Sequence, residues 1–390
     1  MTDTILSINV FSLTLARDTP YLGPLQEGEE PNEQGYFVRK GNSTVYPEFD
    51  RSILVQIETK NGVVGWGETY GLVAPGAVAA IINDLLAGFT IGRDPADPEA
   101  IYNDLYDLIR VRGYTGGFYV DALAAIDIAL WDIAGKQAGK NITKLLGGIL
   151  HKTIPAYVSG LPESTIAQRT ELALSWQARG FNDFKFATPV ANQGAVEEIK
   201  ALREALGSDA KIAVDMHWKY NSAEEALALI AEMEPYHIWF AEAPVQTEEI
   251  FALEKVSKAS GTPIAVGEEW RTVFDMIHRI ERCKVAIVQP EMGHVGITNF
   301  IRIGKLAAQN EIDLIPHATI GIGIFLAASL LASQALRATT YHEFQHSVFE
   351  PNRHLLQGDM TCDSGKYYPP TGSGLGVEPS EEALRLLQPI

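Results

Sequence analysis

The sequence predicts an α/β protein built on a parallel barrel, because short apolar runs alternate with amphipathic helical stretches over its second half. Eight strand-like runs lie between residues 154 and 349, and helical stretches separate most of them. A polar residue stands at the C-terminal end of nearly every run. This favours a barrel over a doubly wound sheet, since barrels carry polar groups at that end. The runs are IPAYVSG, DFKFA, KIAVDMH, IWFAEAP, TPIAVGEE, VAIVQP, DLIPHA and HEFQHSVF.

The first part of the chain predicts two strands, a long polar segment between them, and two helices. Residues 4–16 and 52–59 have the β-branched, alternating character of strands, and residues 77–110 and 121–139 have helical periodicity. The second helix is apolar on nearly all faces and should be deeply buried. The long segment 18–50 between the strands is polar and rich in Gly, Pro, Asn and Glu, as functional or disordered loops are.

Composition and charge narrow the class of protein. The chain has 390 residues, 46% of them apolar and 21% charged, which is ordinary for a soluble globular protein. Its 31 basic and 49 acidic residues give a net charge of −18, so we expect no nucleic-acid partner and no membrane partner. The cysteines Cys283 and Cys362 form no CxxC pair, which argues against a disulfide framework or a zinc cluster. Without a signal peptide pattern or a long apolar span, the predicted location is cytoplasmic.

The polar residues at the strand ends form a regular series. From Asp215 onward, successive gaps are 27, 26, 23, 26 and 26 residues, about one strand–helix unit each. Because alternate residues of a strand face the same way, Asp215 and His217 should point into the same cavity. Three carboxylates from neighbouring strands would repel one another without a cation, and hard oxygen ligands suit Mg²⁺. The series is Lys185, Asp215 with His217, Glu242, Glu268, Glu291, His317 and Glu343.

Each of these residues also has an ordinary structural interpretation. A single acidic residue after a strand is most often a helix N-cap or a solvated charge, and a lone histidine is most often a structural residue. The trio Asp215, Glu242 and Glu268 is harder to explain in that way, because its members stand in register on consecutive units. His217 shares the register of Asp215, and His317 follows a buried run at a strand end.

Motifs spread over nearly the whole chain resemble those of the enolase superfamily, in its mandelate racemase-like branch. They are WGE, AIDIALWDIAGK, VDMH, EAP, GEEW, QPE followed by GHVGIT, PH and GLGVE. The resemblance implies a modified (β/α)₈ TIM-type barrel, (β/α)₇β, with an α+β capping domain built from both termini. We therefore expect a capping domain at 1–135, completed by 365–390, and a barrel at 136–364. The resemblance also implies one Mg²⁺ held by Asp215, Glu242 and Glu268.

The chemistry of this family begins with removal of a proton α to a carboxylate, and the metal stabilises the resulting enediolate. Family members often carry Lys-x-Lys at the end of the second barrel strand, with the second lysine as a base. This chain has Lys185-Phe186-Ala187, so that base is missing, and Lys185 is expected to contact the substrate carboxylate. His317 matches the family's base for the other face. Glu291 stands where an aspartate partner is expected, and it can still fix the imidazole tautomer.

The pattern Asp215-x-His217 resembles that of galactonate-dehydratase-type acid-sugar dehydratases, in which the histidine is the general acid. Glu343 matches a family carboxyl group that binds the substrate carboxylate. The resemblance thus implies β-elimination. His317 takes the α-proton, Lys185 and Mg²⁺ hold the intermediate, and His217 protonates the departing hydroxyl. The product would be a 2-keto-3-deoxy sugar acid.

Three alternatives remain at this point. An isomerase of the same branch, either an epimerase or a cycloisomerase of a sugar lactone or anhydro sugar acid, needs only a different fate for the same intermediate. A non-catalytic barrel is disfavoured, because unselected buried carboxylates are costly. The string His342-Glu343-Phe344-Gln345-His346 matches a zinc-protease motif, but its β-branched and aromatic surroundings favour a strand, on which the two histidines are too far apart for one zinc.

Substrate specificity in this branch comes from loops of the capping domain, here the segment 18–50. Its candidate substrate contacts are Tyr21 and Tyr36, together with Arg39 and Tyr46. The expected partner is a small carboxylate, a sugar acid, and the family is usually homo-oligomeric.

Overall fold

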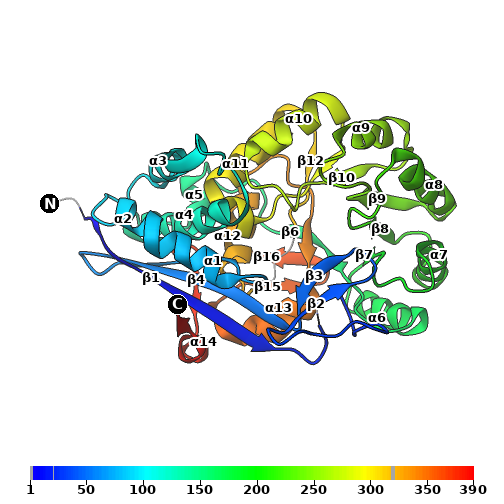
Figure 1. Cartoon of the computed structure of the whole chain (residues 1–390), viewed down its shortest axis with the longest axis horizontal. Coiled ribbons are helices and arrows are strands. Elements are labelled where there is room, and N and C mark those ends of the chain that lie inside the picture. Colours follow the sequence, from blue (N-terminus) through cyan, green and yellow to red (C-terminus); the bar gives the residue numbers. More distant parts are fainter. Residues whose placement is uncertain (1–2, 21, 318–320) are drawn as a thin grey trace.

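A parallel barrel lies beside an antiparallel sheet and a group of helices formed by the N-terminal third of the chain (Figure 1). The structure is a computed structural model, and it describes residues 3–20, 22–317 and 321–390. Among these residues, no helix is long and apolar enough to cross a membrane.

The barrel contains a strand in each of the eight predicted runs, so this prediction is confirmed. Neighbouring strands pair in parallel from β6 to β12, and β13 pairs in parallel with β6. The ring closes between β12 and β13, where Leu314 N donates to Ala338 O (2.8 Å) and Glu343 N donates to Pro316 O (3.3 Å). The strands are β6 (Ile154–Ser159), β7 (Asp183–Ala187), β8 (Lys211–Asp215), β9 (Ile238–Glu242), β10 (Ile264–Val266), β11 (Ile287–Val288), β12 (Asp313–Leu314) and β13 (His342–Phe344).

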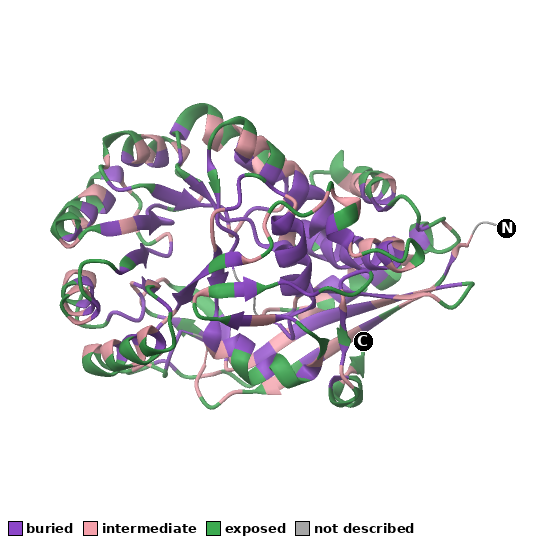
Figure 2. Ribbon diagram, turned by 180° about the vertical axis from the view of Figure 1, so that it is seen from behind, coloured by how far each residue is buried: buried purple, intermediate pink, exposed green. Residues whose placement is uncertain are grey.

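A helix follows each of the first seven barrel strands, which gives the (β/α)₇β order expected from the sequence. These helices surround the buried strands. The first five of them expose their outer faces, whereas the last one is buried along its whole length (Figure 2). They are α6 (Ile166–Ala178), α7 (Ala195–Leu206), α8 (Ala223–Met233), α9 (Ile250–Ala259), α10 (Val273–Cys283), α11 (Met292–Gln309) and α12 (Ile324–Gln334). The short segments η2 (Glu234–Tyr236), α13 (His346–Asn352) and η3 (Arg353–Leu355) lie in the connections.

The N-terminal sheet is antiparallel, with the order β18-β1-β4-β5. The buried helix α4 (Gly117–Gln137) packs against β5, and the two elements are in tight contact at Gly67. A Cβ atom at Gly67 would lie 1.9 Å from Ala125 O, so no other residue fits there without moving the helix. The strands are β1 (Ile5–Ala16), β4 (Phe49–Thr59), β5 (Val64–Tyr70) and β18 (Gln388–Pro389).

The prediction of one helix over residues 77–110 is wrong. The segment contains α1 (Pro75–Ile81), a π-helical turn η1 (Ile82–Leu86), α2 (Ala87–Thr90) and, after a break, α3 (Pro98–Arg110). Gly92 has a positive φ of 86° and ends the first part. Asp97 then caps a new helix by accepting from Ala100 N (3.0 Å), with Pro98 at its first position.

The segment 18–50 contains a β-hairpin, formed by β2 (Tyr36–Arg39) and β3 (Thr44–Pro47). Its inward side chains Phe37 and Tyr46 form a small apolar cluster with Leu22, Ala187 and Val190, so the hairpin rests on the end of β7. In Figure 1 the hairpin lies beside the strands of the barrel.

The C-terminal tail returns to the N-terminal sheet, as expected, because β18 pairs antiparallel with β1. Asp132 of α4 holds the tail in place, since its carboxylate accepts from Leu375 N (2.8 Å) and from Trp66 N (3.0 Å). Before this return, β16 pairs with β6 of the barrel. The remaining elements are α5 (Ile142–Leu145), β14 (Leu356–Gly358), β15 (Thr361–Asp363), β16 (Lys366–Tyr368), β17 (Val377–Pro379) and α14 (Glu381–Leu386).

Candidate active site

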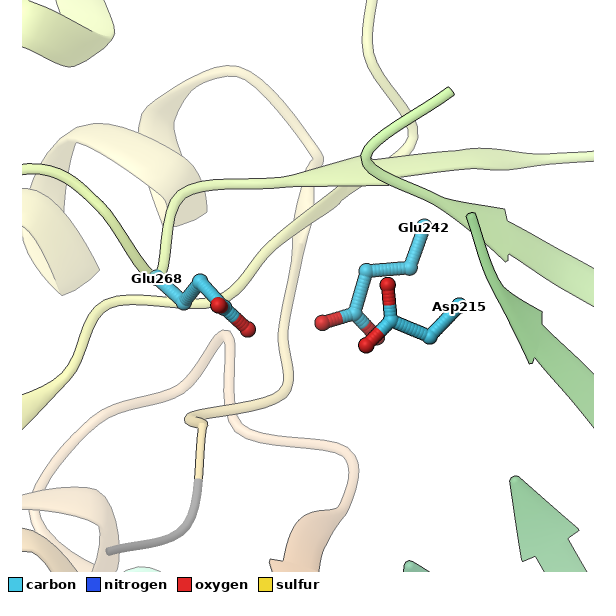
Figure 3. A group of neighbouring side chains, drawn as sticks. All are labelled: Asp215, Glu242 and Glu268. Carbon is cyan, nitrogen blue, oxygen red and sulfur yellow. The ribbon is translucent and has the colours of Figure 1, made fainter. Parts of the chain in front are cut away.

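Three carboxylates meet at the C-terminal end of the barrel (Figure 3). Asp215 is the last residue of β8, Glu242 is the last residue of β9, and Glu268 follows β10 by two residues. Each offers an oxygen that lies within 4.8 Å of an oxygen of the other two. Parallel strands end at the same edge, which is why residues this far apart in the chain converge.

The electrostatics of this carboxylate group fit a bound cation. Burial raises the pKa of Glu268 well above its usual range, and the charges of Asp215 and Glu242 raise it further. Burial alone would raise the pKa of Asp215. The charge of the neighbouring His217 and its hydrogen bonds to Asp215 outweigh burial and lower the pKa of Asp215 to about 2. Glu242 Oε1 is buried without a hydrogen-bond partner among the described residues. An unpartnered buried oxygen between two further carboxylates is a suitable ligand for a hard divalent cation.

A buried lysine lies next to this group. Lys185 Nζ is 2.7 Å from Glu242 Oε2 and 2.8 Å from Glu343 Oε1. Gln289 Nε2 donates to the same Glu242 oxygen (2.9 Å), and Ser159 Oγ donates to Glu343 Oε1. Burial opposes the charge of Lys185, but the two glutamates raise its pKa well above the usual range. Lys185 is therefore a fixed positive charge at this end of the barrel.

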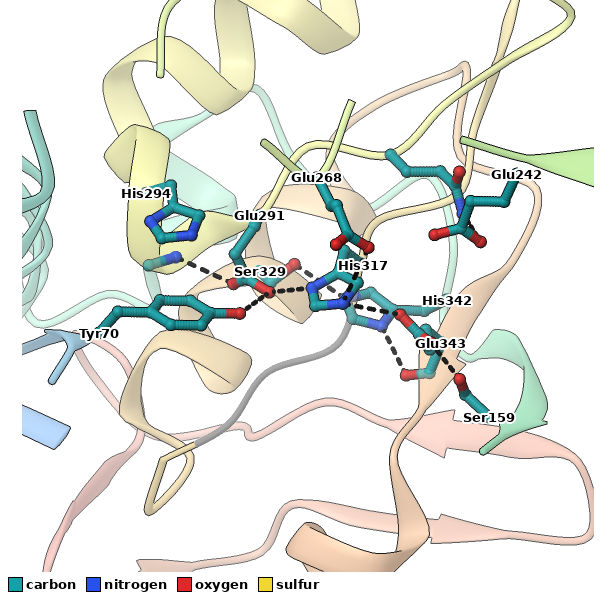
Figure 4. A network of polar contacts seen from close by, with 12 residues as sticks. Tyr70, Ser159, Glu242, Glu268, Glu291, His294, His317, Ser329, His342 and Glu343 are labelled. Carbon is teal, nitrogen blue, oxygen red and sulfur yellow. Dashed lines mark hydrogen bonds and ion pairs between the residues drawn. The ribbon is translucent and has the colours of Figure 1, made fainter. Parts of the chain in front are cut away.

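A histidine and a glutamate form a dyad on the other side of the carboxylate group (Figure 4). His317 Nδ1 lies 2.7 Å from Glu291 Oε2, so the longer glutamate side chain does reach the imidazole. Glu291 is held in turn, because Oε1 accepts from Gly293 N (3.0 Å) and Oε2 accepts from Tyr70 Oη (3.1 Å). Burial lowers the pKa of His317, but the surrounding carboxylates, Glu268 first among them, raise it to about 10.

His217 stands beside the first carboxylate in a strained backbone. Its Nε2 lies 3.0 Å from Asp215 Oδ2, and its backbone N donates to Asp215 Oδ1 (2.9 Å). His217 and Trp218 both have left-handed backbone angles, with φ of 49° and 51°. Non-glycine residues in this conformation cluster at functional sites, because the surrounding structure must hold them there.

His217, Glu268 and His317 line one cavity of about 380 Å³. This volume is within the range of small-molecule sites. Its remaining walls come from the hairpin, from the N-terminal unit and from the loops after the barrel strands. They are Thr44, Val45, Tyr46, Tyr70, Leu72, Val73, Phe118, Asp121, Trp218, Arg271 and His294.

The four residues of segment 18–50 that were proposed as substrate contacts differ in their position relative to the cavity. Tyr46 lines the cavity, whereas Tyr21 lies outside the described residues. The prediction for Tyr36 needs correction: its hydroxyl accepts from Ala74 N (3.1 Å) and it does not line the cavity, because residues alternate sides along β2 and its neighbour Phe37 faces inward. Arg39 is also corrected. It is completely buried and binds Glu29 (2.9 Å) within the segment itself.

Several residues of the site escaped the sequence interpretation. Ser159 is the last residue of β6, and Gln289 directly follows β11. Their positions at strand ends are a sequence signal, but their side chains are neutral and therefore stand out less than the charged residues of the series. The opposite wall carries a second polar group, in which Asp121 Oδ1 lies 2.7 Å from Arg271 Nε and 2.8 Å from His294 Nδ1. The ring of His294 stacks on Tyr70 at 4.1 Å.

The zinc-protease string is not a metal site in this structure. His342 lies on β13 and contacts Ser329 Oγ (2.8 Å), whereas His346 begins α13 and contacts Gly160 O (3.0 Å). Burial lowers the pKa of each to about 4. Both are structural histidines, as the sequence context indicated.

The fold and this cluster of acidic and basic groups define a barrel enzyme with a carboxylate-rich centre, and comparisons with known proteins identify its family. The family model "Enolase C-terminal domain-like" matches residues 168–383, and "Mandelate racemase / muconate lactonizing enzyme, N-terminal domain" matches residues 45–147. The chain therefore belongs to the enolase superfamily.

Individual relatives are similar over most of their length. The chain is 32% identical to D-galactarolactone cycloisomerase from Agrobacterium fabrum, over 86% of this chain and 91% of that protein. It is 30% identical to D-galactonate dehydratase from Xanthomonas euvesicatoria, over 88% and 92%. A crystal structure of a member of the enolase superfamily from Agrobacterium tumefaciens is 67% identical, with a TM-score of 0.97 and complete coverage of both chains.

Proposed function

We propose that this protein is a Mg²⁺-dependent dehydratase of acid sugars. It removes the proton next to a substrate carboxylate, eliminates the hydroxyl group from the neighbouring carbon and forms a 2-keto-3-deoxy acid. One observation carries the proposal. His317, which pairs with Glu291, and His217, which contacts Asp215, line one cavity beside the carboxylate group. The similarity to proteins named D-galactonate dehydratase supports the substrate class.

The ligands proposed for Mg²⁺ are Asp215, Glu242 and Glu268, whose oxygens converge within 4.8 Å. When bound there, the cation supplies positive charge that offsets the negative charge developing on the substrate carboxylate. Oxygen-only ligands and the unpartnered Glu242 Oε1 favour Mg²⁺ over softer metals.

His317 is the proposed base. A cation on the carboxylate group would offset the charge of Glu268, which is the main cause of the raised pKa of His317, and would favour the neutral ring. With Glu291 ionised, Nδ1–H of that ring donates to Glu291 Oε2 at 2.7 Å, and the lone pair is on Nε2. Tyr70 and Gly293 fix the glutamate and therefore the plane of the imidazole. Lys185 is the proposed partner of the substrate carboxylate, together with Glu343, because its buried charge is already held at this end of the barrel.

His217 is the proposed acid. It lines the same cavity as His317, and it follows Asp215 by two residues, as in the dehydratase pattern. Ala187 occupies the position at which a second base would stand, and it is covered by the hairpin cluster. A reaction that needs one base and one acid therefore suits the site better than a racemisation with two bases.

The second candidate is a cycloisomerase of a sugar lactone or anhydro sugar acid. It is favoured by the similarity to a protein named D-galactarolactone cycloisomerase, and it needs the same single base and acid. The two functions differ in the product, because elimination of water gives a keto acid whereas a cycloisomerase opens or closes a ring without losing water.

A substrate panel tests the proposal and separates the candidates. Mg²⁺-loaded enzyme is incubated with aldonic acids, aldaric acids, their lactones and anhydro sugar acids, and 2-keto products are trapped with semicarbazide. A keto product that disappears in EDTA and in His317→Asn supports the dehydratase. A rearranged ring in NMR without a keto product supports the cycloisomerase. Neither turnover nor deuterium exchange with any member of the panel would contradict both.

We extend the proposal to the organisation of the chain, with a capping domain at 1–135 and 365–390 and a barrel at 136–364. The antiparallel return of β18 to β1 supports the contribution of the tail to the first unit.

A further inference from the structure

A second group of polar side chains lines the cavity, and the proposed reaction does not use it. Arg271 follows β10, Asp121 belongs to the first turns of α4, and His294 belongs to the first turn of α11. We call these three residues the polar wall. They come from three different elements of the fold, and all of them line the same cavity as His217 and His317.

Contacts between side chains join the polar wall to the proposed base. The ring of His294 stacks on Tyr70 with the centroids 4.1 Å apart, and Tyr70 Oη donates to Glu291 Oε2 (3.1 Å). The same oxygen lies 2.7 Å from His317 Nδ1. Figure 4 shows His294 and Glu242 on opposite sides of His317. A substrate whose carboxylate lies beside the carboxylate group therefore extends its other end toward the polar wall.

The positive charge of the polar wall is already paired. Arg271 Nε lies 2.7 Å from Asp121 Oδ1, and Arg271 Nη1 donates to Glu269 O (2.7 Å). Burial and the charge of Arg271 lower the pKa of His294, so that its ring is neutral at neutral pH. The three side chains of the polar wall together therefore carry no net charge.

The polar wall keeps one donor group and one acceptor for a ligand. Asp121 Oδ1 accepts from His294 Nδ1 at 2.8 Å, so the hydrogen of the neutral ring is on Nδ1 and the lone pair is on Nε2. Arg271 Nη2 carries two further N–H donors. Within residues 3–20, 22–317 and 321–390, neither His294 Nε2 nor Arg271 Nη2 has a hydrogen-bond partner. The side chains of Arg271 and His294 are 19% and 14% exposed, so both remain accessible.

A hydroxyl group matches this arrangement, whereas a carboxylate does not. The oxygen of a hydroxyl can accept from Arg271 Nη2, and its hydrogen can be donated to His294 Nε2. An ionised carboxylate has no hydrogen to donate, so it would face the lone pair of Nε2 and lie near the charge of Asp121. Among the described residues that line the cavity, Arg271 is the only arginine or lysine, and its charge is paired.

We propose that the polar wall binds the end of the substrate opposite its reacting carboxylate, and that it selects a hydroxylated end over a second carboxylate. This inference rests on the proposed function and narrows its substrate class to acids with one carboxylate, such as aldonic acids, over aldaric acids. Arg271 and His294 are the specificity-determining contacts. Asp121 acts through them, because it neutralises Arg271 and orients the ring of His294.

The preference is measured by calorimetry with Mg²⁺ in the His317→Asn background, in which the bound acid is not consumed. The probes are gluconate with glucarate, galactonate with galactarate, and mannonate with mannarate, because the members of each pair differ only in the group at the last carbon. At least one aldonic acid should bind about tenfold or more tightly than its aldaric partner. This measurement requires no change in the polar wall.

Asp121→Asn, added to the same background, tests the cause. The amide oxygen can still accept from His294 Nδ1, but the negative charge is lost and Arg271 becomes an unpaired cation. The preference for the aldonic acid should then fall by about tenfold or more, mainly because the aldaric acid binds more tightly. The matched control is Glu381→Gln in α14, which removes one negative charge from the exposed pair with Arg385 and should leave the preference unchanged.

The outcomes separate this inference from the proposed function. If an aldaric acid binds as tightly as its aldonic partner, or if Asp121→Asn lowers the melting temperature without changing the preference, the polar wall is only a structural contact and the inference is wrong. The dehydratase assignment stands in either case if the wild type forms a keto product. If the aldonic acid is preferred and Asp121→Asn removes the preference, but the wild type forms no keto product, the subsite stands and the dehydratase assignment fails.

Failure of all six acids to bind would also overturn the inference. The lactones and anhydro sugar acids of the substrate panel would then decide the reaction separately.

Discussion

Replacing Glu291 by glutamine changes one oxygen of the carboxyl group that contacts His317. Gly293 N donates to Glu291 Oε1 at 3.0 Å, so in the variant the amide oxygen must remain at that position. The amide nitrogen then takes the place of Oε2, which is 2.7 Å from His317 Nδ1. It donates to Nδ1, and the imidazole hydrogen moves to Nε2, the atom that must accept the substrate proton.

The expected loss is large, because the base is held in the wrong tautomer. The corresponding acid-to-amide change in serine proteases, which also reverses the tautomer, lowers turnover about 10⁴-fold, or about 5 kcal/mol in the barrier. We expect Glu291→Gln to lower the rate of deuterium exchange at the α-carbon by about 10³- to 10⁴-fold. The assay is NMR in D₂O with Mg²⁺ and the substrate found in the panel.

The matched control is Tyr70→Phe, which removes the other side-chain donor to Glu291 Oε2 and leaves the carboxylate in place. Its exchange rate should fall by no more than about 10²-fold, since one hydrogen bond to an ionised carboxylate contributes about 1.5–3 kcal/mol. A Glu291→Gln variant that melts like the wild type and exchanges within about tenfold of it would refute the dyad argument.

Three further outcomes are expected. Mg²⁺ at about 100 times its dissociation constant should raise the free energy of unfolding by about 2.7 kcal/mol in thermal melts, and EDTA should reverse this stabilisation. If Mg²⁺ stabilised Glu268→Gln by the same amount, the proposed set of metal ligands would be contradicted. Glu68→Ala should lower the free energy of unfolding by about 3 kcal/mol, because it leaves backbone N–H groups at the start of α12 unpaired. The control Glu58→Ala, at a half-buried position, should change the free energy of unfolding by about 0.5 kcal/mol or less. Equal effects of the two substitutions would contradict the role of Glu68. Ala187→Lys should raise KM, because the larger side chain displaces the hairpin cluster, and it should not add a second base. Racemisation of the substrate by this variant would show that the new lysine does act as a base.

The barrel was predictable because its signal is periodic. Each apolar run contains a strand, and the spacing from Asp215 onward placed polar residues at one edge. Since strand ends of a parallel barrel meet, the convergence of Asp215, Glu242 and Glu268 followed from sequence spacing alone. Helical periodicity does not predict the break between α2 and α3, and the sequence signals for it are the glycine and prolines of residues 92–98.

The walls of the cavity could not be predicted in the same way. Which side of the hairpin faces inward depends on its register, and a shift of one residue would exchange Tyr36 for Phe37. The charge of Arg39 is compatible with a substrate contact, but Arg39 forms a buried ion pair with Glu29 of the same segment. The contact between Asn42 and His217 joins residues with no local relation in the sequence, so only the folded chain reveals it.

The division of labour between the two histidines is the central claim, and one measurement tests it most directly. His317→Asn and His217→Asn are each incubated with substrate and Mg²⁺ in D₂O, and exchange at the α-carbon and elimination are followed in the same NMR sample. The account predicts that His317→Asn loses both reactions, whereas His217→Asn loses elimination by about 10²-fold or more and keeps exchange. Loss of exchange in His217→Asn, or exchange that survives in His317→Asn, would contradict it.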